Sequence, residues 1–361
     1  MIVRRVAPVA GLFLLAPLVG EFLLGNVGID RLGVLPFFAL LYGSGALLIR
    51  ETVRRTGRGW PAIVLLAAAY ALFEEGPIDQ LLWNPSYGGG QHMLAGDAYV
   101  PALGTNISIV QAVLSLHTIW SISVPIALVE TFVSRRRTTP WLGRVGLAVT
   151  GGLFALGAAA GYAESHGAGQ FQADPGELAG AVTVIVALVV LAFVTPYRPR
   201  PIDRAAPDPW LVGALTLVLT SALLCLVMFW PGALSQWLSV AAWCVVAATL
   251  ATLIGRWSRY RGWGAAHRLG AAAGALLTYA WVAFPHQPVS GGSGAHAYAV
   301  DLLGNTVFAL FAVVLIVLAA RTVRRGGGHD RAGGSDPGRT SGPDLRQTRR
   351  AIARRHHEPH D

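Results

Sequence analysis

The chain has 361 residues, of which 53% are hydrophobic and 13% charged, and its mean hydropathy is +0.52. Soluble domains usually carry about 25% charged residues, so this composition excludes an ordinary soluble domain and indicates a membrane protein. The net charge is +9 although the chain contains no Lys, and residues 321–361 hold ten Arg against five acids. A basic surface that faces anionic lipid headgroups explains this balance better than nucleic-acid binding, so we expect no nucleic-acid partner.

Ten apolar runs are long enough to cross a hydrocarbon layer of about 30 Å, which predicts an all-α, polytopic membrane helix bundle. The first run lacks a small-residue cleavage site, so we interpret it as a membrane anchor rather than a signal peptide. The predicted spans are 7–24, 33–49, 60–84, 109–133, 146–165, 179–196, 210–230, 236–255, 269–285 and 301–320.

The Arg residues alternate between the two sides of these spans. With the N-terminus in the cytoplasm, every Arg outside the apolar runs faces the cytoplasm except Arg31. This asymmetry follows the positive-inside rule and predicts that both termini are cytoplasmic. A chain rich in Ala and Gly but free of Lys is typical of GC-rich bacterial genomes, so the predicted location is the bacterial plasma (inner) membrane.

Two regions are predicted along the chain. Residues 1–320 form a transmembrane helical domain, and residues 321–361 form a disordered, basic cytoplasmic tail, since the segment from Gly326 onward is rich in Gly, Ser, Pro and charge. The longest connection between spans, 85–108, is rich in Gly and Pro. Loops of this length act as lids or stay unstructured, and both interpretations remain open.

The third and fourth spans carry ionisable residues inside apolar runs: Glu74 and Glu75 in one, His117 in the other. An ionisable group at the bilayer centre costs about 2.5–3.5 kcal/mol on insertion scales, so it indicates a functional site. A rise of 1.5 Å per residue puts Glu74 about 15 Å and His117 about 12 Å from the outer ends of their helices. We therefore expect the three side chains to lie at one level and take them as candidate catalytic residues.

Further polar residues gather in the outer halves of the spans, and they are expected to support this site or to pack between helices without any function. Glu130 differs, because it lies near the inner end of its span beside Arg135–Arg137, where an interfacial ion pair explains it. The supporting residues that we predict are Asp79, Ser121, Glu21, His166, Asp301 and Asn305.

Adjacent helical residues point about 100° apart, so we expect one of Glu74 and Glu75 to face the pocket and the other to bind a neighbouring helix. Pro77 and Pro125 each remove a helical hydrogen bond, which predicts a kink beside each charged residue. Two carboxylates in a dry site can act as base and acid on water, with His117 orienting the water or holding an oxyanion. Alternatively, the same three side chains would ligate one divalent metal ion that activates the water.

The pair Glu74–Glu75, followed by His117 in a later helix, resembles the CAAX-protease and bacteriocin-processing family of intramembrane peptidases. The pattern of that family is EExxxR, then FxxxH, then HxxxN or HxxxD, and its Glu and His residues carry peptide hydrolysis. The resemblance covers about residues 70–121 and implies an intramembrane hydrolase.

This sequence departs from the family pattern at several positions. Asp79 stands at the Arg position and Val113 at the Phe position. For the third motif the chain offers only His166, with Gln170 in place of Asn or Asp.

Three functional hypotheses remain open. The first is a glutamate- and histidine-dependent intramembrane hydrolase that acts on a membrane-embedded peptide or a lipid-linked substrate. The second is a proton- or cation-coupled transporter of a small solute, which uses the same buried carboxylates, although the chain lacks an internal repeat. The third is a non-catalytic membrane scaffold.

Overall fold

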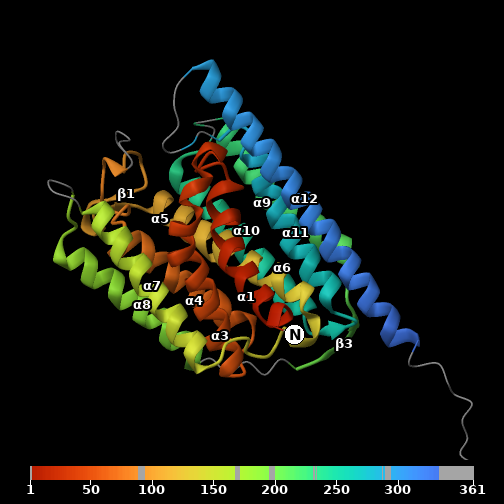
Figure 1. Cartoon of the computed structure of the whole chain (residues 1–361). Helices are drawn as coiled ribbons and strands as arrows, with labels where there is room; N and C mark the ends of the chain where they lie inside the picture. The colour runs from red at the N-terminus through yellow and green to blue at the C-terminus, as the bar shows by residue number, and fades with distance from the viewer. Residues whose placement is uncertain are drawn as a thin grey trace, which may run out of the picture.

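The computed structural model describes residues 2–87, 94–166, 171–194, 200–230, 234–286 and 294–332, together with residues 232 and 288. These residues form an all-α bundle (Figure 1). Nine helices among them are long and apolar enough to span a membrane. The predicted fold class, a polytopic membrane helix bundle, is confirmed.

Short π-helical and 3₁₀ segments interrupt the helices of the first third of the chain, whereas the later helices are continuous. The α-helices are α1 (Ile2–Pro17), α2 (Leu35–Phe38), α3 (Ser44–Arg55), α4 (Trp60–Phe73), α5 (Ile107–Ser115), α6 (Val124–Phe132), α7 (Arg144–Ser165), α8 (Pro175–Val194), α9 (Pro209–Phe229), α10 (Gln236–Trp257), α11 (Ala265–Val282) and α12 (Ala295–Ala332). The π-helical segments are η1 (Leu18–Phe22), η3 (Ala39–Gly43), η4 (Glu74–Ile78) and η7 (Leu116–Ser123), and the 3₁₀ segments are η2 (Ile29–Val34), η6 (Pro101–Leu103) and η8 (Ser134–Arg136).

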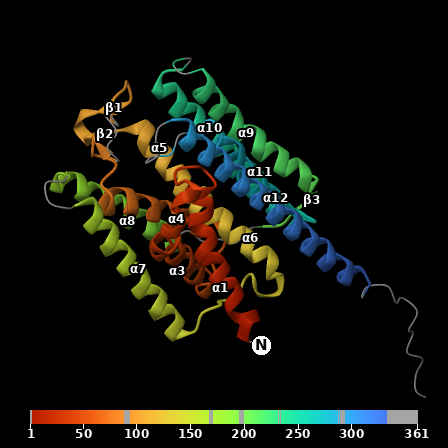
Figure 2. The same cartoon turned by 45° about the horizontal axis from the view of Figure 1, so that its top comes forward.

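Helix α11 is where the bundle differs from the ten predicted spans. It covers most of the predicted span 269–285, but it is not one of the nine helices that qualify by length and composition. Its glycines face α9 closely: a Cβ atom on Gly274 would lie 2.4 Å from the carbonyl oxygen of Gly213. Small residues let the backbones of two helices approach closely, but they contribute little to the mean hydropathy of α11. Helix α11 is therefore a packing helix that runs beside α9 and α12 (Figure 2).

Helix α12 continues to Ala332, beyond the predicted end of the transmembrane domain at residue 320. Arg is a good helix former, so the three Arg residues 321, 324 and 325 do not end the helix. The rest of the predicted tail, 333–361, lies outside the described residues, and its disorder stays a prediction.

The connections between helices gather at two ends of the bundle (Figure 1). At one end, β3 (Ile202–Ala205) pairs in parallel with β4 (Tyr260–Arg261). At the opposite end, β1 (Tyr99–Val100) pairs with β2 (Thr105–Asn106) in an antiparallel hairpin. We call the first of these the Arg-rich end, because the connections after α3, α6, α8 and α10 carry half of the Arg residues that precede the tail.

The described part of the loop 85–108 is folded onto α10. The side chain of Asn106 donates to Oε1 of Gln236 at 2.9 Å, and the indole of Trp237 donates to the carbonyl oxygen of Asp97 at 2.8 Å. Asn106 is fully buried. Of the two interpretations left open by the sequence, an unstructured loop does not fit this part of the segment.

A buried charged network joins the helices at the Arg-rich end. Arg50 and Glu51 of α3 are 0% exposed, and the guanidinium of Arg50 donates to the carboxylate of Glu51 at 2.7 Å. Arg50 and Arg54 also bind the carboxylate of Glu130 in α6, at 3.1 and 2.7 Å. Glu51 accepts a hydrogen bond from the backbone N–H of Trp141 at 2.8 Å, and the Arg50 guanidinium stacks 3.3 Å over the Trp141 ring. Burial is tolerated here because each charge has an opposite charge and hydrogen bonds.

Glu130 was expected to form an interfacial pair with Arg135–Arg137, and the structure corrects this. The Glu130 carboxylate is buried and faces α3, whereas Arg136 and Arg137 contribute their backbone carbonyl oxygens as acceptors for Arg50. The partner of Glu130 is therefore set by the packing of α6 on α3 and not by proximity in the chain.

The substitution Glu51→Gln is expected to destabilise the fold by about 3–5 kcal/mol, because it leaves the buried Arg50 charge without its closest partner. Thermal unfolding of the detergent-purified protein measures this. The matched control is Asp203→Asn, which removes the solvent-exposed ion pair with Arg261 and should leave the midpoint unchanged. Equal midpoints for the two variants would contradict the structural role of the network.

Candidate functional site

Four π-helical segments, all of those in the described ranges, carry the polar residues at the centre of the bundle. They belong to four different spans, and η1 and α4 both pack against η7. A π turn is rare and is frequently found at functional sites. The polar residues on these segments are Glu21 (η1), Tyr42 (η3), Glu74 and Glu75 (η4), and His117 and Ser121 (η7).

The two prolines singled out in the sequence lie at these segments. Pro77 is inside η4, where the backbone N–H of Asp79 donates to the carbonyl oxygen of Glu74 at 2.8 Å, five residues back. Pro125 lies in the first turn of α6, directly after η7. A missing N–H and a bulky ring disturb the regular ladder of α-helical hydrogen bonds. A π turn thus lies at or directly before each proline, and the predicted kinks stay a prediction.

His117 lies between the two carboxylates. Its Nε2 atom forms a hydrogen bond with Oε1 of Glu75 at 2.7 Å. On the other edge of the ring, Nδ1 lies 3.0 Å from Oε2 of Glu74 and forms a hydrogen bond with Oγ of Ser121 at 3.2 Å. All four side chains are buried, and none is more than 6% exposed. The structure thus brings together the three candidate catalytic residues and Ser121.

The expectation that only one of Glu74 and Glu75 would face the site is wrong. Adjacent side chains diverge, but the two nitrogens of an imidazole also lie on different edges of the ring. The carboxylates therefore reach His117 from two sides without converging on one point. The sequence argument assumed that both carboxylates would have to reach one atom. An imidazole offers two nitrogen atoms on different edges of its ring.

The same geometry does not fit a metal centre. No group of three or more His, Cys, Asp or Glu side chains in the described ranges could hold a metal ion. Glu74 and Glu75 approach different ring nitrogens, so the candidate ligands Glu74, Glu75 and His117 do not share a common point at ligand distance.

A chain of polar side chains leads from this cluster toward the end with β1 and β2. The ring of Tyr42 lies 5.4 Å from the His117 ring, measured between centroids, and its hydroxyl donates to Glu21 at 2.9 Å. The second oxygen of Glu21 accepts from Asn26 at 3.1 Å, and Asn26 forms a hydrogen bond with the half-buried His286 at 2.8 Å. Glu21, predicted as a supporting residue, is thus linked to the site through Tyr42.

Several polar atoms around His117 have no hydrogen-bond partner in the part of the chain that the structure describes. They are Oε2 of Glu74, Oε2 of Glu75, the hydroxyl of Tyr70 and Oγ of Ser44, all on buried side chains. The approach of Oε2 of Glu74 to Nδ1 of His117 at 3.0 Å is therefore a close contact and not a hydrogen bond. The Tyr70 ring lies 6.2 Å from the His117 ring. Buried polar atoms are nearly always paired, so unpaired ones mark a functional site or a place of strain.

Two of the predicted supporting residues, Asp79 and Asn305, form hydrogen bonds outside the central cluster. Asp79 accepts a hydrogen bond from the hydroxyl of Tyr87 at 2.6 Å, one turn beyond Glu75. Asn305 donates to the carbonyl oxygen of Ala283 at the end of α11, at 2.8 Å. The contact of Asn305 caps a helix and does not involve the central cluster.

Two other supporting residues are not joined to His117 by any contact of the described residues. His166 ends α7 and forms a hydrogen bond with the carbonyl oxygen of Tyr162, on which its ring also stacks. Asp301 lies at the start of α12, near Gly28. The third motif of the peptidase resemblance is therefore not assembled around His117, and Gln170 lies outside the described residues.

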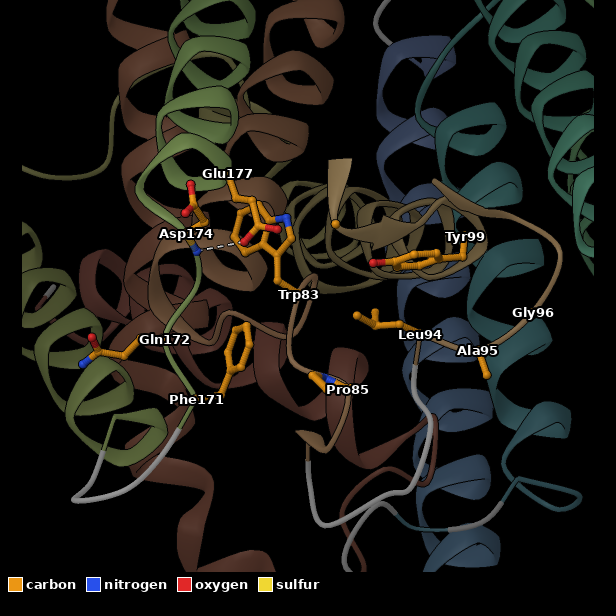
Figure 3. A pocket seen from close by; sticks show the side chains of 11 residues that line it. Trp83, Pro85, Leu94, Ala95, Gly96, Tyr99, Phe171, Gln172, Asp174 and Glu177 are labelled. Carbon is orange, nitrogen blue, oxygen red and sulfur yellow. Dashed lines mark hydrogen bonds between the residues drawn. The ribbon is translucent and has the colours of Figure 1, made fainter. Parts of the chain in front are cut away.

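A cavity of about 660 Å³ opens between the loop 94–104 and the start of α8. Figure 3 shows Trp83 between Tyr99 on one side and the acidic side chains of Asp174 and Glu177 on the other. A volume between about 300 and 1,000 Å³ is typical of sites for small molecules. The sequence did not predict this cavity, because α8 and the loop after η4 are distant along the chain.

The segment between the central cluster and this cavity is strained. Gln80 has a φ of 55°, which non-glycine residues rarely adopt, and its side chain accepts from the backbone N–H of Ala173 at 2.7 Å. The backbone N–H of Leu82 donates to the carbonyl oxygen of Glu75 at 3.3 Å, next to Trp83. The wall of the cavity and the carboxylates thus belong to one short segment held away from its relaxed conformation.

Sequence reasoning missed Tyr42, Tyr70 and Gly20 in this site. The two tyrosines look like ordinary membrane-helix aromatics, and only the crossing of the helices puts them beside His117. Gly20 has a specific steric role: a Cβ atom there would lie 2.4 Å from Oγ of Ser121. The hydroxyl that bonds to His117 therefore occupies space that only glycine leaves free.

A family model described as "Uncharacterized membrane protein family" matches residues 12–329. The chain belongs to this family. Membership in this family supports a multi-pass membrane protein. The matched residues include the central cluster and the lining of the cavity. No curated protein and no solved structure matches the chain, and the resemblance to CAAX-type peptidases is not shown by these comparisons.

The substitution Gly20→Ala is expected to destabilise the protein by about 1–3 kcal/mol, since the added methyl group overlaps the Ser121 hydroxyl. Combining it with Ser121→Ala should recover most of the loss. The control is Gly11→Ala in the same span, where an added Cβ atom would have no atom within 4 Å and the change should be neutral or stabilising. If Gly20→Ala unfolds at the same temperature as Gly11→Ala, the contact is not made.

Proposed function

We propose that this protein is a proton-coupled transporter in which Glu74, His117 and Glu75 form the proton-binding site. The observation that carries the proposal is the imidazole with a carboxylate oxygen within 3.0 Å of each ring nitrogen. A neutral imidazole has one N–H, and its second nitrogen accepts a hydrogen bond, which the hydroxyl of Ser121 can donate to Nδ1. The imidazole and the two carboxylates can each bind a proton, so in this proposal a proton is exchanged among the three groups.

Such a cluster can gain or lose a proton while its atoms hardly move. When the two carboxyl groups and the imidazole together hold two protons, counting the N–H of a neutral imidazole, their net charge is −1. A third proton makes the net charge zero. In a site with few water molecules this difference in charge strongly alters the energy of neighbouring polar groups. Buried carboxylates serve proton relays in membrane transporters for this reason.

Burial supports proton handling over hydrolysis. A hydrolytic site needs room for a reacting carbon about 3 Å from the nucleophile or the activated water. Glu74, His117 and Ser121 are at most 3% exposed, and the lining of the cavity of about 660 Å³ does not include them. A proton needs only hydrogen-bonding groups, and the series through Tyr42 and Glu21 offers these toward the surface.

The π-helical segments supply a way to couple protonation to movement. Converting a π turn to an α turn removes one residue from the turn and rotates the helix beyond it. In η4 this rotation would move Glu75 away from His117 and shift Trp83, which lines the cavity. In this proposal the cavity receives a small solute, and the Arg-rich end faces the bacterial cytoplasm, as the positive-inside rule expects.

The test is charge movement after a pH step, recorded from proteoliposomes on a solid-supported membrane. The wild-type protein should give a transient current when the outer pH falls, and the variant Glu74→Gln/Glu75→Gln should give less than about a tenth of it, since a Gln cannot take up a proton. The charge-matched control is Glu164→Gln/Asp203→Asn, which neutralises two exposed acids outside the central cluster and outside the lining of the cavity. Currents of equal size in both double variants would refute the proposal.

Hydrolysis remains the second candidate because of one observation. Ser121, His117 and Glu75 form a hydrogen-bonded series of hydroxyl, imidazole and carboxylate, the order found in serine hydrolases. A fluorophosphonate probe that labels the wild-type protein but not Ser121→Ala would favour this candidate over transport. We expect no labelling, since Gly20 packs against the Ser121 hydroxyl and leaves no space for a reacting group.

A further inference from the structure

Outside the central cluster, a narrow crevice at the Arg-rich end combines several cationic side chains. It lies between the start of α4, the end of α6 and the start of α11. Its cavity volume is only about 10 Å³, so a ligand group would lie at its mouth and not inside it. The residues that line it are Trp60, Ala127, Glu130, Thr131, Ser134, Arg137, Ala265 and Arg268.

The only carboxylate in this lining is already engaged. Both oxygens of Glu130 are bound by guanidinium groups, with Arg50 at 3.1 Å and Arg54 at 2.7 Å. Arg137 and Arg268 line the same crevice, and neither side chain forms an ion pair or a hydrogen bond with any residue that the structure describes. Four guanidinium groups thus lie near one carboxylate, and two of them, Arg137 and Arg268, have no carboxylate of the described residues within ion-pair distance.

Like charges that share a partly buried crevice repel each other, and the repulsion is stronger where water is scarce. An anion at the mouth would remove this repulsion and supply the missing acceptors. Guanidinium groups bind phosphate oxygens through paired N–H donors, a geometry that favours Arg over Lys. Trp60 begins α4 at the same place and is partly buried, as expected of a tryptophan at the level of the lipid headgroups.

We propose that the phosphate group of an anionic lipid binds at the mouth of this crevice, held by Arg137 and Arg268. The lipid headgroup would bridge α11 to the connection after α6. Its acyl chains would follow the apolar surface of the neighbouring helices. This site is separate from the proton-binding cluster, and the proposal does not depend on the transport function.

The test is native mass spectrometry of the full-length, delipidated protein titrated with phosphatidylglycerol. The wild-type protein should retain one tightly bound phosphatidylglycerol, and Arg137→Gln/Arg268→Gln should bind it at least about tenfold more weakly, since charge-assisted hydrogen bonds are lost. The charge-matched control is Arg5→Gln/Arg144→Gln, two exposed Arg residues outside the crevice, and it should bind like the wild-type protein. Phosphatidylcholine should not compete.

Each other outcome overturns the proposal. Equal weakening in the two double variants would mean that the lipid senses only net charge. Equal binding of phosphatidylcholine would exclude recognition of negative charge. If inorganic phosphate alone displaces the lipid at equal concentration, with the same dependence on Arg137 and Arg268, the site takes a free anion and not a lipid.

A second double variant separates loss of lipid binding from loss of the folded structure. Arg137→Lys/Arg268→Lys keeps both charges but loses the paired donors, so it should show an intermediate loss of affinity while eluting as the wild-type protein does in size-exclusion chromatography. Full wild-type affinity in the Lys variant would show that no specific geometry at Arg137 and Arg268 is required and would also overturn the proposal.

Discussion

The contacts of His117 with Glu75 and Glu74 are the interactions on which the centre of this bundle depends, because hydrocarbon does not tolerate charges without partners. Two carboxylates one residue apart in a membrane helix would repel each other. An imidazole from another helix lies between them, with one carboxylate oxygen within 3.0 Å of each ring nitrogen, and it can take up the proton that offsets this repulsion. The contact of the η4 carboxylates with η7 meets this requirement, and the glycine at position 20 leaves space for Ser121 beside His117.

The bundle contains two buried polar centres that differ in how completely their groups are paired. In the network at the Arg-rich end, the carboxylates of Glu51 and Glu130 accept donors on both oxygens, and such saturation makes a rigid joint. Around His117, buried atoms of Glu74, Glu75, Tyr70 and Ser44 lack hydrogen-bond partners. Incomplete pairing costs stability, so its presence beside four π turns indicates that this centre is kept for function.

Much of the candidate site could be predicted from local features of the sequence. Glu74, Glu75 and His117 were predicted because they are ionisable residues inside apolar spans. Their distances from the helix ends predicted that they lie at one level. Pro77 and Pro125 indicated where the helices become irregular. The assignments that failed were those requiring knowledge of helix partners. Glu130 pairs with α3 instead of its neighbours in the chain, and His166 bonds to its own helix. Nothing in the sequence connects Tyr42 with His117.

The sequence by itself determined that this is a multi-pass helical membrane protein, because hydropathy and length act on each helix separately. It also determined which residues are too polar for lipid. Only the tertiary structure decided which of them meet, since helices in a bilayer gain little by hiding apolar surface and choose partners through close packing and polar contacts. Glycines 213 and 274 place α11 inside the bundle, although its hydropathy is too low to mark a span, and helix crossing makes one cluster of residues from four spans.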